Sequence, residues 1–150
     1  MTDIVSPETR SRMMAGIRGS DTKIEVTLRK SLFARGFRYR INDRSLPGKP
    51  DLVFPRYRAA ILVHGCFWHG HDCHLFRLPG TRRDFWEAKI GRNRANDASV
   101  SERLASQGWR VLTVWECSLR GPVRLGLDSV TDSAARWLVS GSTSYEIRGG

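Results

Sequence analysis

The sequence predicts a mixed α/β fold, in which a small central sheet is flanked by helices. Three observations predict it: helix-spaced apolar residues precede Gly36, short apolar or alternating runs fill residues 37–63, and helix and strand patterns alternate again over residues 81–138. The length of 150 residues favours a single domain over residues 1–150. A chain of this size buries about 70% of its unfolded surface, so it has room for a hydrophobic core.

The first part of the chain, residues 1–20, is basic and is predicted to begin a helix at Ser6-Pro7. Ser is favoured at the N-cap and Pro at the first helical position. A second helix is expected from Asp21 or Thr22 to Gly36, where a glycine ends it. The apolar residues that define its buried face are Ile24, Leu28 and Leu32.

Three strands are predicted next. Phe37–Ile41 alternates apolar and basic residues, which predicts a half-exposed strand. Pro50–Phe54 predicts a second strand, and Pro55–Arg58 is expected to turn the chain back. Ala59–Val63 contains only apolar residues and predicts a buried third strand.

The remaining elements continue the alternation of helix and strand. A helical pattern covers residues 81–108, with a break near Gly91 as an open alternative. Trp109–Trp115 predicts a fourth strand and Asp128–Leu138 a last helix. Residues 141–150 are polar and are expected to form a disordered tail.

The charge of the chain is strongly positive, with 25 basic and 15 acidic residues and a net charge of +10. The basic residues divide into 21 Arg and 4 Lys. Arg makes planar, bidentate contacts to phosphate, so this balance predicts a polyanionic partner. A codon bias toward Arg is the alternative explanation. The net charge falls from +6 in residues 1–50 to +3 in 51–100 and +1 in 101–150, which predicts an anion-facing surface in the first two thirds.

Two classes of protein are excluded by the sequence pattern. The longest apolar run, Ala59–Val63, is far too short to cross a membrane, and residues 1–20 carry charges where a secretion signal needs an apolar segment. We therefore expect a cytoplasmic protein without membrane contact. In that compartment the three Cys are expected to be thiols, metal ligands or catalytic groups rather than disulfides.

Residues 65–80 combine His, Cys, Gly and aromatic residues without periodicity and predict a loop. Zinc prefers four N and S ligands in tetrahedral geometry, and a site with four protein ligands is structural because no position is open for water. The predicted ligands are Cys66, His71, Cys73 and Cys117, with His69 and His74 competing for the place of His71. The alternative is that these Cys are small buried hydrophobic residues.

Two adjacent aromatic residues, Phe67 and Trp68, lie in this loop, and Trp86 lies on the following helix. Apolar side chains held rigidly at a surface can insert between base steps of DNA. The alternative is that these rings fill the core beneath the loop. The basic residues around them, which favour a DNA-facing role, are Arg77, Arg82 and Arg83.

Asp51 opens the second strand and is a candidate Mg²⁺ ligand, because Mg²⁺ takes oxygen ligands and bridges phosphate oxygens. An Asp after Pro is also common in turns. Glu25 lies on the helix before the first strand, where Thr22-x-x-Glu25 fits a capping box equally well. Asp97 lies among Arg residues of the long helix, where a solvated acid that balances charge is the alternative.

Two histidines, His64 and His69, flank the end of the third predicted strand. A neutral imidazole near pH 7 can take a proton from water, which is the task of a general base in phosphodiester hydrolysis. Isolated histidines are usually structural. Their position beside a candidate metal carboxylate and a candidate zinc loop favours catalysis.

Several unusual sequence words occur in one order along the chain: Arg10–Met14, Gly36–Arg40, Pro47–Asp51, His64–His69, Gly108–Val111 and Val114–Cys117. Through these words the chain, from about Ser6 to Leu138, resembles the very short patch repair (Vsr) DNA mismatch endonuclease family. That resemblance implies a restriction-endonuclease-like fold and the activity of a mismatch-directed DNA nicking enzyme.

The resemblance also implies roles for the candidate residues. Asp51 would be the direct Mg²⁺ ligand, with the main-chain carbonyl of Val63 beside it, and His69 would be the base that activates water. The other polar groups it implies in the active site are His64, near the scissile phosphate, and Glu25 and Asp97, which would orient metal-bound waters. The implied structural zinc ligands are Cys66, His71, Cys73 and Cys117. The implied DNA-binding residues are the wedges Phe67, Trp68 and Trp86 and the basic residues Arg10, Arg12 and Lys89, with residues 1–20 clasping the DNA.

Three positions depart from related patterns. The wider nuclease superfamily has an acid and a Lys on the third strand, where Ile61-Leu62-Val63 offers neither, and His69 is implied to replace the Lys. Val63 stands where Thr is frequent in the repair branch, so the carbonyl remains but a hydroxyl is lost. Asn96 stands where a basic residue is common, which removes a phosphate contact.

The implied substrate is double-stranded DNA with a T:G mismatch, which arises when 5-methylcytosine deaminates. The implied cofactors are catalytic Mg²⁺ and structural Zn²⁺. We expect a monomer in the bacterial cytoplasm, associated with the nucleoid, with mismatch-repair proteins as further partners. Two alternatives are a restriction-type endonuclease on paired DNA and a non-catalytic, zinc-stabilised DNA-binding module.

Overall fold

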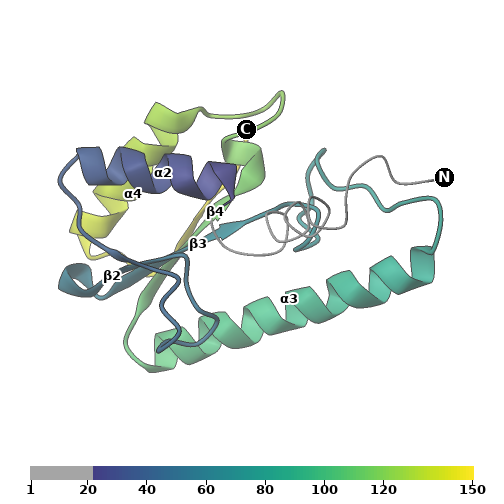
Figure 1. Cartoon of the computed structure of the whole chain (residues 1–150), viewed down its shortest axis with the longest axis horizontal. Helices are drawn as coiled ribbons and strands as arrows, with labels where there is room; N and C mark the ends of the chain where they lie inside the picture. The colour runs from purple at the N-terminus through teal and green to yellow at the C-terminus, as the bar shows by residue number, and fades with distance from the viewer. Residues whose placement is uncertain (1–21) are drawn as a thin grey trace, which may run out of the picture.

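The structure is a computed structural model that describes residues 22–150 (Figure 1). The helix predicted at Ser6-Pro7, and with it Arg10 and Arg12, lies outside these residues. The described elements are α2 (Lys23–Ala34), β1 (Arg40–Ile41), β2 (Leu52–Phe54), β3 (Ala59–His64), α3 (Arg83–Ser106), β4 (Arg110–Trp115), α4 (Leu127–Ser140) and β5 (Tyr145–Ile147), with short 3-10 helices at Pro55–Tyr57 and Glu116–Ser118.

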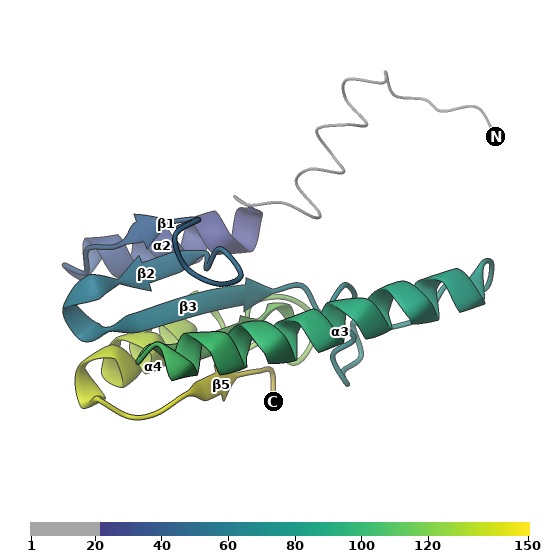
Figure 2. The ribbon, with the colours of Figure 1, turned by 90° about the horizontal axis from the view of Figure 1, so that it is seen from below.

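The strands form one mixed sheet in the order β1-β2-β3-β4-β5. The first three strands pair antiparallel, whereas β4 and β5 run parallel to β3. Helices α2 and α4 pack together on one face of the sheet, and α3 covers the other face (Figures 1 and 2). The predicted mixed sheet flanked by helices is therefore confirmed.

Two apolar clusters hold the helices against the sheet. The larger cluster lies between the sheet and helices α2 and α4, to which Leu28, Leu32 and Ala134 contribute fully buried side chains. The smaller one joins Leu62 of β3 to Leu104 of α3 on the opposite face. Each fully buried Leu contributes about 1.5–3 kcal/mol through its removal from water. These contacts fix all three helices against the sheet. At the carboxyl end of β3, His64 pairs in register with Trp115 of β4.

Helix α2 buries a slightly different face from the one predicted. Its buried residues are Glu25, Leu28 and Leu32, while Ile24 is only half-buried. A fully buried carboxylate on an otherwise apolar face is costly unless a partner or a ligand compensates it. The position of Glu25 therefore marks this end of α2 as more than a capping site.

Helix α3 runs without interruption through Gly91, so the alternative of a break there is wrong. A Gly in a helix interior costs only about 1 kcal/mol relative to Ala, which the rest of a 24-residue helix tolerates. Its first half extends past the end of β3, beside the 65–80 loop (Figures 1 and 2). Within residues 22–150, no helix is both long and apolar enough to cross a bilayer.

The expected disordered tail over residues 141–150 is wrong for residues 145–147. These residues form β5, which pairs with β4 from Leu112↔Tyr145 to Val114↔Ile147 and buries Ile147. The short alternation in Tyr145–Ile147 is too weak a signal to stand out in a polar segment, and the pairing is supplied by β4 across the sheet. The first strand is also shorter than the predicted Phe37–Ile41, because only Arg40 and Ile41 pair with β2.

Candidate active site and metal cluster

A cleft of about 710 Å³ is lined by the start of α2, the residues at the start of β2, the end of β3 and one side of α3. We call it the strand-end cleft. It gathers side chains from four separate parts of the chain. Its acidic, histidine and aromatic lining residues are Glu25, Asp51, Asp97, His64, His69, Phe67 and Trp68. The carboxylates and imidazoles predicted for catalysis thus share one cavity.

Asp51 lies just before β2, at the end of the loop that connects β1 to β2. Its Oδ2 atom accepts a hydrogen bond of 2.6 Å from the Val63 backbone N–H. Burial, and then the negative charge of Glu25, raise the pKa of Asp51 to about 7. The buried Glu25 and the half-buried Asp51 repel each other when both carboxylates are ionised, and such a pair is a donor set suited to a cation.

Glu25 reaches the cleft from the first turn of α2. The side-chain oxygen of the N-cap residue Thr22 accepts a hydrogen bond of 3.4 Å from the Glu25 backbone N–H. This bond is one half of the capping box that the sequence suggested. The Glu25 side chain itself is only 1% exposed and lies 3.7 Å from the Arg29 guanidinium. The helix start therefore serves to direct this carboxylate inward, toward Asp51.

The two histidines lie in direct contact. The rings of His64, the last residue of β3, and His69 stack with centroids 3.8 Å apart and planes within 4°. The Nδ1 atom of His69 lies 2.6 Å from the Asp97 carboxylate, which α3 supplies. Asp97 is therefore a partner of His69, which the sequence did not indicate, and its sequence alternative as a merely solvated acid is wrong.

His64 lies in a nearly closed environment, with 9% of its surface exposed. Burial, and then the proximity of His69, lower the pKa of His64 to about 3. Its Nδ1 atom is buried and has no hydrogen-bond partner among the described residues. His64 lines the strand-end cleft, and a buried polar atom without a partner is uncommon in a folded protein.

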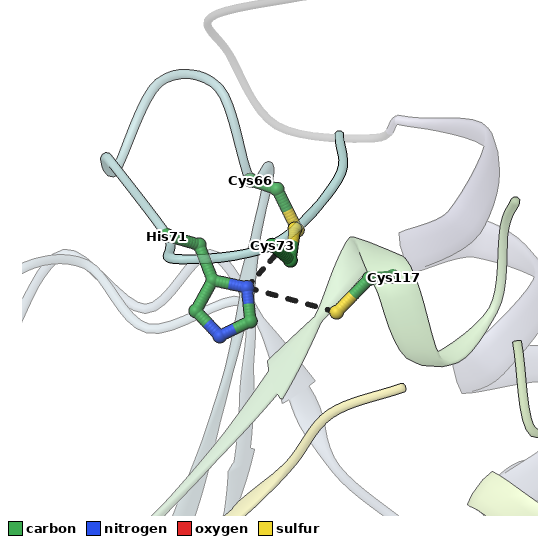
Figure 3. Close-up of side chains that lie close together, drawn as sticks. All are labelled: Cys66, His71, Cys73 and Cys117. Atoms are coloured by element: carbon green, nitrogen blue, oxygen red, sulfur yellow. Dashed lines mark hydrogen bonds between the residues drawn. The ribbon is translucent and has the colours of Figure 1, made fainter. Parts of the chain in front are cut away.

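A second cluster of polar side chains joins the 65–80 loop to the 3-10 helix that follows β4. Cys66, His71, Cys73 and Cys117 place one ligand atom each within 4.8 Å of one another (Figure 3). The Nδ1 atom of His71 lies 3.5 Å from Cys66 Sγ and 3.6 Å from Cys117 Sγ. A sulfur at about 2.3 Å and a nitrogen at about 2.05 Å from one tetrahedral ion lie roughly 3.5 Å apart. The cluster is therefore spaced to hold a metal ion.

The structure also resolves which histidine joins the cysteines. His71 points its Nδ1 atom at the cluster (Figure 3), His69 bonds Asp97 instead, and His74 is exposed. Burial raises the pKa of the Cys66 thiol in the absence of a cation. Cys66 and Cys117 are buried with Trp115 in a small cluster that is separate from the two larger core clusters.

The aromatic residues form a third group at the mouth of the cleft. Phe67 and Trp68 pack edge-on, with ring centroids 5.2 Å apart, and Trp86 of α3 lies 5.5 Å from Phe67 and 5.7 Å from Trp68. All three rings are only half-buried, and none belongs to the described core clusters. The alternative that they fill the core is wrong.

Several residues of the site were missed by the sequence reasoning. Asn93 of α3 donates a hydrogen bond of 2.7 Å to the Trp68 carbonyl, and Glu116 accepts one of 3.0 Å from the Cys66 N–H. For Glu116 the sequence offered one signal, its position directly before the candidate metal ligand Cys117. The cations that line the cleft are Lys23, Lys49, Arg120 and the predicted Lys89.

The sheet, the strand-end cleft and the cysteine cluster define a class: α/β enzymes whose acid–base groups gather where strands end. A sequence model of the family described as DNA mismatch endonuclease Vsr matches residues 2–75. The DNA mismatch endonuclease Vsr of Escherichia coli (strain K12) is 44% identical over 147 residues, which cover 98% of this chain and 94% of that protein. The chain belongs to the Vsr DNA mismatch endonuclease family.

Two further relatives carry names of nicking enzymes. Type II nicking enzyme V.XorIIP of Xanthomonas oryzae pv. oryzae is 47% identical over 79% of this chain and 88% of its own. Type II nicking enzyme V.NmeAIP of Neisseria meningitidis is 44% identical over 80% of this chain and 86% of its own. The resemblance read from the sequence words is confirmed.

Proposed function

We propose that this protein is a Mg²⁺-dependent endonuclease that nicks one strand of duplex DNA beside a T:G mismatch, such as deamination of 5-methylcytosine creates. The names of its relatives support nicking and mismatch specificity. The observation that carries the proposal is the shared cleft. Its lining brings the carboxylates of Glu25 and Asp51 together with His69, whose ring is bonded to Asp97. Family membership supports a restriction-endonuclease-like fold for the mixed sheet.

Asp51 is the residue we propose as the direct Mg²⁺ ligand, with the Val63 carbonyl as a second oxygen and Glu25 orienting metal-bound water. The hydrogen bond from the Val63 N–H to Asp51 supports the closeness of these two groups. The mutual repulsion of Asp51 and Glu25 supports a cation between or beside them. When bound there, Mg²⁺ would neutralise charge on the phosphate oxygens.

His69 is the proposed general base. With a proton on Nδ1 donated to Asp97, its Nε2 atom is left as an acceptor for a water proton. We therefore propose Asp97 as the positioning residue of His69, rather than a group that orients metal-bound water. His64, held neutral by burial, would be a polar group of the active site near the scissile phosphate.

The cysteine cluster is the proposed structural zinc site. Four protein ligands leave no place for a reacting water, and the S···N distances match tetrahedral coordination. The site would tie the 65–80 loop to the end of β4 through Cys117. That connection would hold Phe67, Trp68 and His69 in place.

DNA recognition is proposed to use the aromatic group together with the cations of the cleft. Phe67, Trp68 and Trp86 would insert beside the mismatch, where stacking is already weak. Lys89 would contact a phosphate, as would Arg10 and Arg12 in the N-terminal segment. Asn96 is exposed at the cleft and would leave its phosphate contact to neighbouring cations. We propose that the enzyme acts as a monomer on DNA of the bacterial nucleoid, in the cytoplasm and with mismatch-repair proteins.

The decisive experiment is strand-specific nicking of an end-labelled T:G duplex, with and without Mg²⁺, on a denaturing gel. We expect one product from one strand, formed only with Mg²⁺, and none from the T:A duplex. Asp51→Asn should bind the duplex but not cut it; persistent Mg²⁺-dependent nicking by this variant would falsify the catalytic assignment.

The same gel distinguishes the two alternatives. Cutting of both strands of the fully paired duplex would indicate a restriction-type endonuclease. Salt-sensitive binding without any product after prolonged incubation with Mg²⁺ would indicate a DNA-binding module.

A further inference from the structure

The segment that follows β5, Arg148–Gly150, lies across the cysteine cluster. The Gly149 N–H donates a hydrogen bond of 3.3 Å to Cys117 Sγ. The next N–H, of Gly150, donates to the Val123 carbonyl at 3.0 Å, so the segment is held on both sides of Cys117. A backbone N–H aimed at a cysteine sulfur stabilises the thiolate form that binds metal.

Gly149 is the residue type that this close approach requires. A Cβ atom at this position would lie 2.6 Å from the Cys117 carbonyl oxygen and 2.9 Å from the Val123 carbonyl oxygen. Both obstacles are backbone atoms, which cannot move aside as a flexible side chain can. The absence of a side chain thus allows the N–H to reach the sulfur.

Arg148 anchors the same segment from the other side of the cluster. One guanidinium nitrogen donates to Asp72 Oδ1 at 2.8 Å and the other to the Asp72 backbone carbonyl at 3.1 Å. Asp72 is the neighbour of two cluster residues, and its Oδ1 atom also lies 3.7 Å from His71 Nε2. This distance is too long for a hydrogen bond, so Asp72 acts on the His71 ring through its negative charge, which raises the basicity of the ring.

We propose that Arg148, Gly149 and Asp72 form an outer clasp of the metal cluster, which slows the loss of the bound ion and shields it from chelators. The inference rests on the structural metal site proposed above. The clasp joins the cluster through two ligands, His71 by way of Asp72 and Cys117 by way of Gly149. The clasp gives a function to the segment after β5, which does not line the strand-end cleft.

The test measures zinc release from the full-length, zinc-loaded protein to an excess of a coloured chelator. We expect Arg148→Ala to release zinc about tenfold faster, within the range typical of outer-shell changes at metal sites. Asp72→Ala should be at least as fast, because it also loses the contact with His71. The double variant should be no faster than Asp72→Ala alone, since both substitutions break one pair.

Arg136→Ala is the matched control, because Arg136 is an exposed Arg on α4 that lines a separate pocket. It should release zinc at the parent rate. Parent-rate release from Arg148→Ala would overturn the clasp while leaving the metal site intact. A parent protein that is folded but contains no zinc by elemental analysis would instead overturn the metal site itself.

A measurement on the unmodified chain covers the case in which the variants fold poorly. In ¹⁵N-labelled protein loaded with cadmium-113, the hydrogen bond should transmit a scalar coupling between the Gly149 amide proton and the metal. The coupling supports the clasp, and its absence in a cadmium-loaded protein whose cysteine ligands do show coupling contradicts it.

Discussion

The contact between the His69 imidazole and the Asp97 carboxylate determines which ring nitrogen is available to the cleft. His69 Nδ1 and Asp97 Oδ2 lie 2.6 Å apart, although each side chain keeps 24% of its surface exposed. Among residues 22–150, hydrogen bonding engages only the Nδ1 atom of the His69 ring, which leaves its Nε2 atom available to a ligand. At the scale of single residues, this pair is the most direct link between geometry and reaction.

Replacing that carboxylate should therefore impair catalysis without impairing binding. We expect Asp97→Asn to lower the single-turnover nicking rate by about 10²- to 10⁴-fold, the range that general-base catalysis supplies. Affinity for the T:G duplex, measured by fluorescence anisotropy, should stay close to that of the parent, since the proposed role of Asp97 is to position His69 and not to bind phosphate. Glu102→Gln removes the same charge from an exposed position of α3 and should nick at the parent rate. Equal rates for Asp97→Asn and the parent would refute the positioning role.

The aromatic residues make a second residue-scale prediction, which concerns discrimination. Phe67 and Trp68 are half-buried and contact each other and Trp86 rather than the core. Their joint replacement by Ala should reduce the preference for T:G over T:A duplexes by about tenfold or more, because stacking on an aromatic ring contributes about 1–3 kcal/mol per base. The ratio of the two nicking rates measures this. An unchanged ratio would mean that the wedges lie elsewhere.

Helix α3 illustrates what a sequence determines at the scale of an element. The apolar spacing that predicted it fixes its contacts through Val100 and Leu104. The same periodicity does not say which polar side chain meets the 65–80 loop. The pairing of Asp97 with His69 and the contact of Asn93 with the loop were therefore found only in the structure. Strand β5 was missed for the same reason, since its pairing with β4 depends on a partner distant in sequence.

The glycine inside this helix gives a prediction about stability. Gly91 is exposed, and a Cβ atom built there meets nothing within 4 Å. Gly91→Ala should stabilise the protein by about 0.5–1 kcal/mol, because Ala loses less conformational freedom in a helix than Gly. Urea unfolding measures the change. Gly48→Ala is the opposite control, since its Cβ would lie 2.4 Å from Val100 Cγ1 and its φ is +74°; it should destabilise the protein.

At the scale of the whole molecule, a large apolar cluster and the cysteine cluster stabilise different parts of the protein. The large apolar cluster holds α2 and α4 to the strands and includes no residue of the cysteine cluster. The cysteine cluster instead brings the 65–80 loop to the segment after β4, where His71 stacks on Trp115. The sequence words of the loop predicted these ligands, whereas the stacking of His71 on Trp115, with centroids 4.0 Å apart, needed the assembled sheet.

This division predicts how the protein responds to loss of one of the proposed zinc ligands. Cys73→Ser should lower the thermal midpoint, by about 2–4 °C for each kcal/mol lost in a chain of this size. The far-ultraviolet circular dichroism at 25 °C should nevertheless remain close to that of the parent, because the apolar cluster that supports the sheet is untouched. Nicking should fall much further than stability does, since the loop that carries His69 loses its anchor. Treatment of the parent with a zinc chelator should reproduce all three effects. If Cys73→Ser keeps the parent midpoint and nicks at the parent rate, the cluster is no anchor and the loop is held by its aromatic contacts alone.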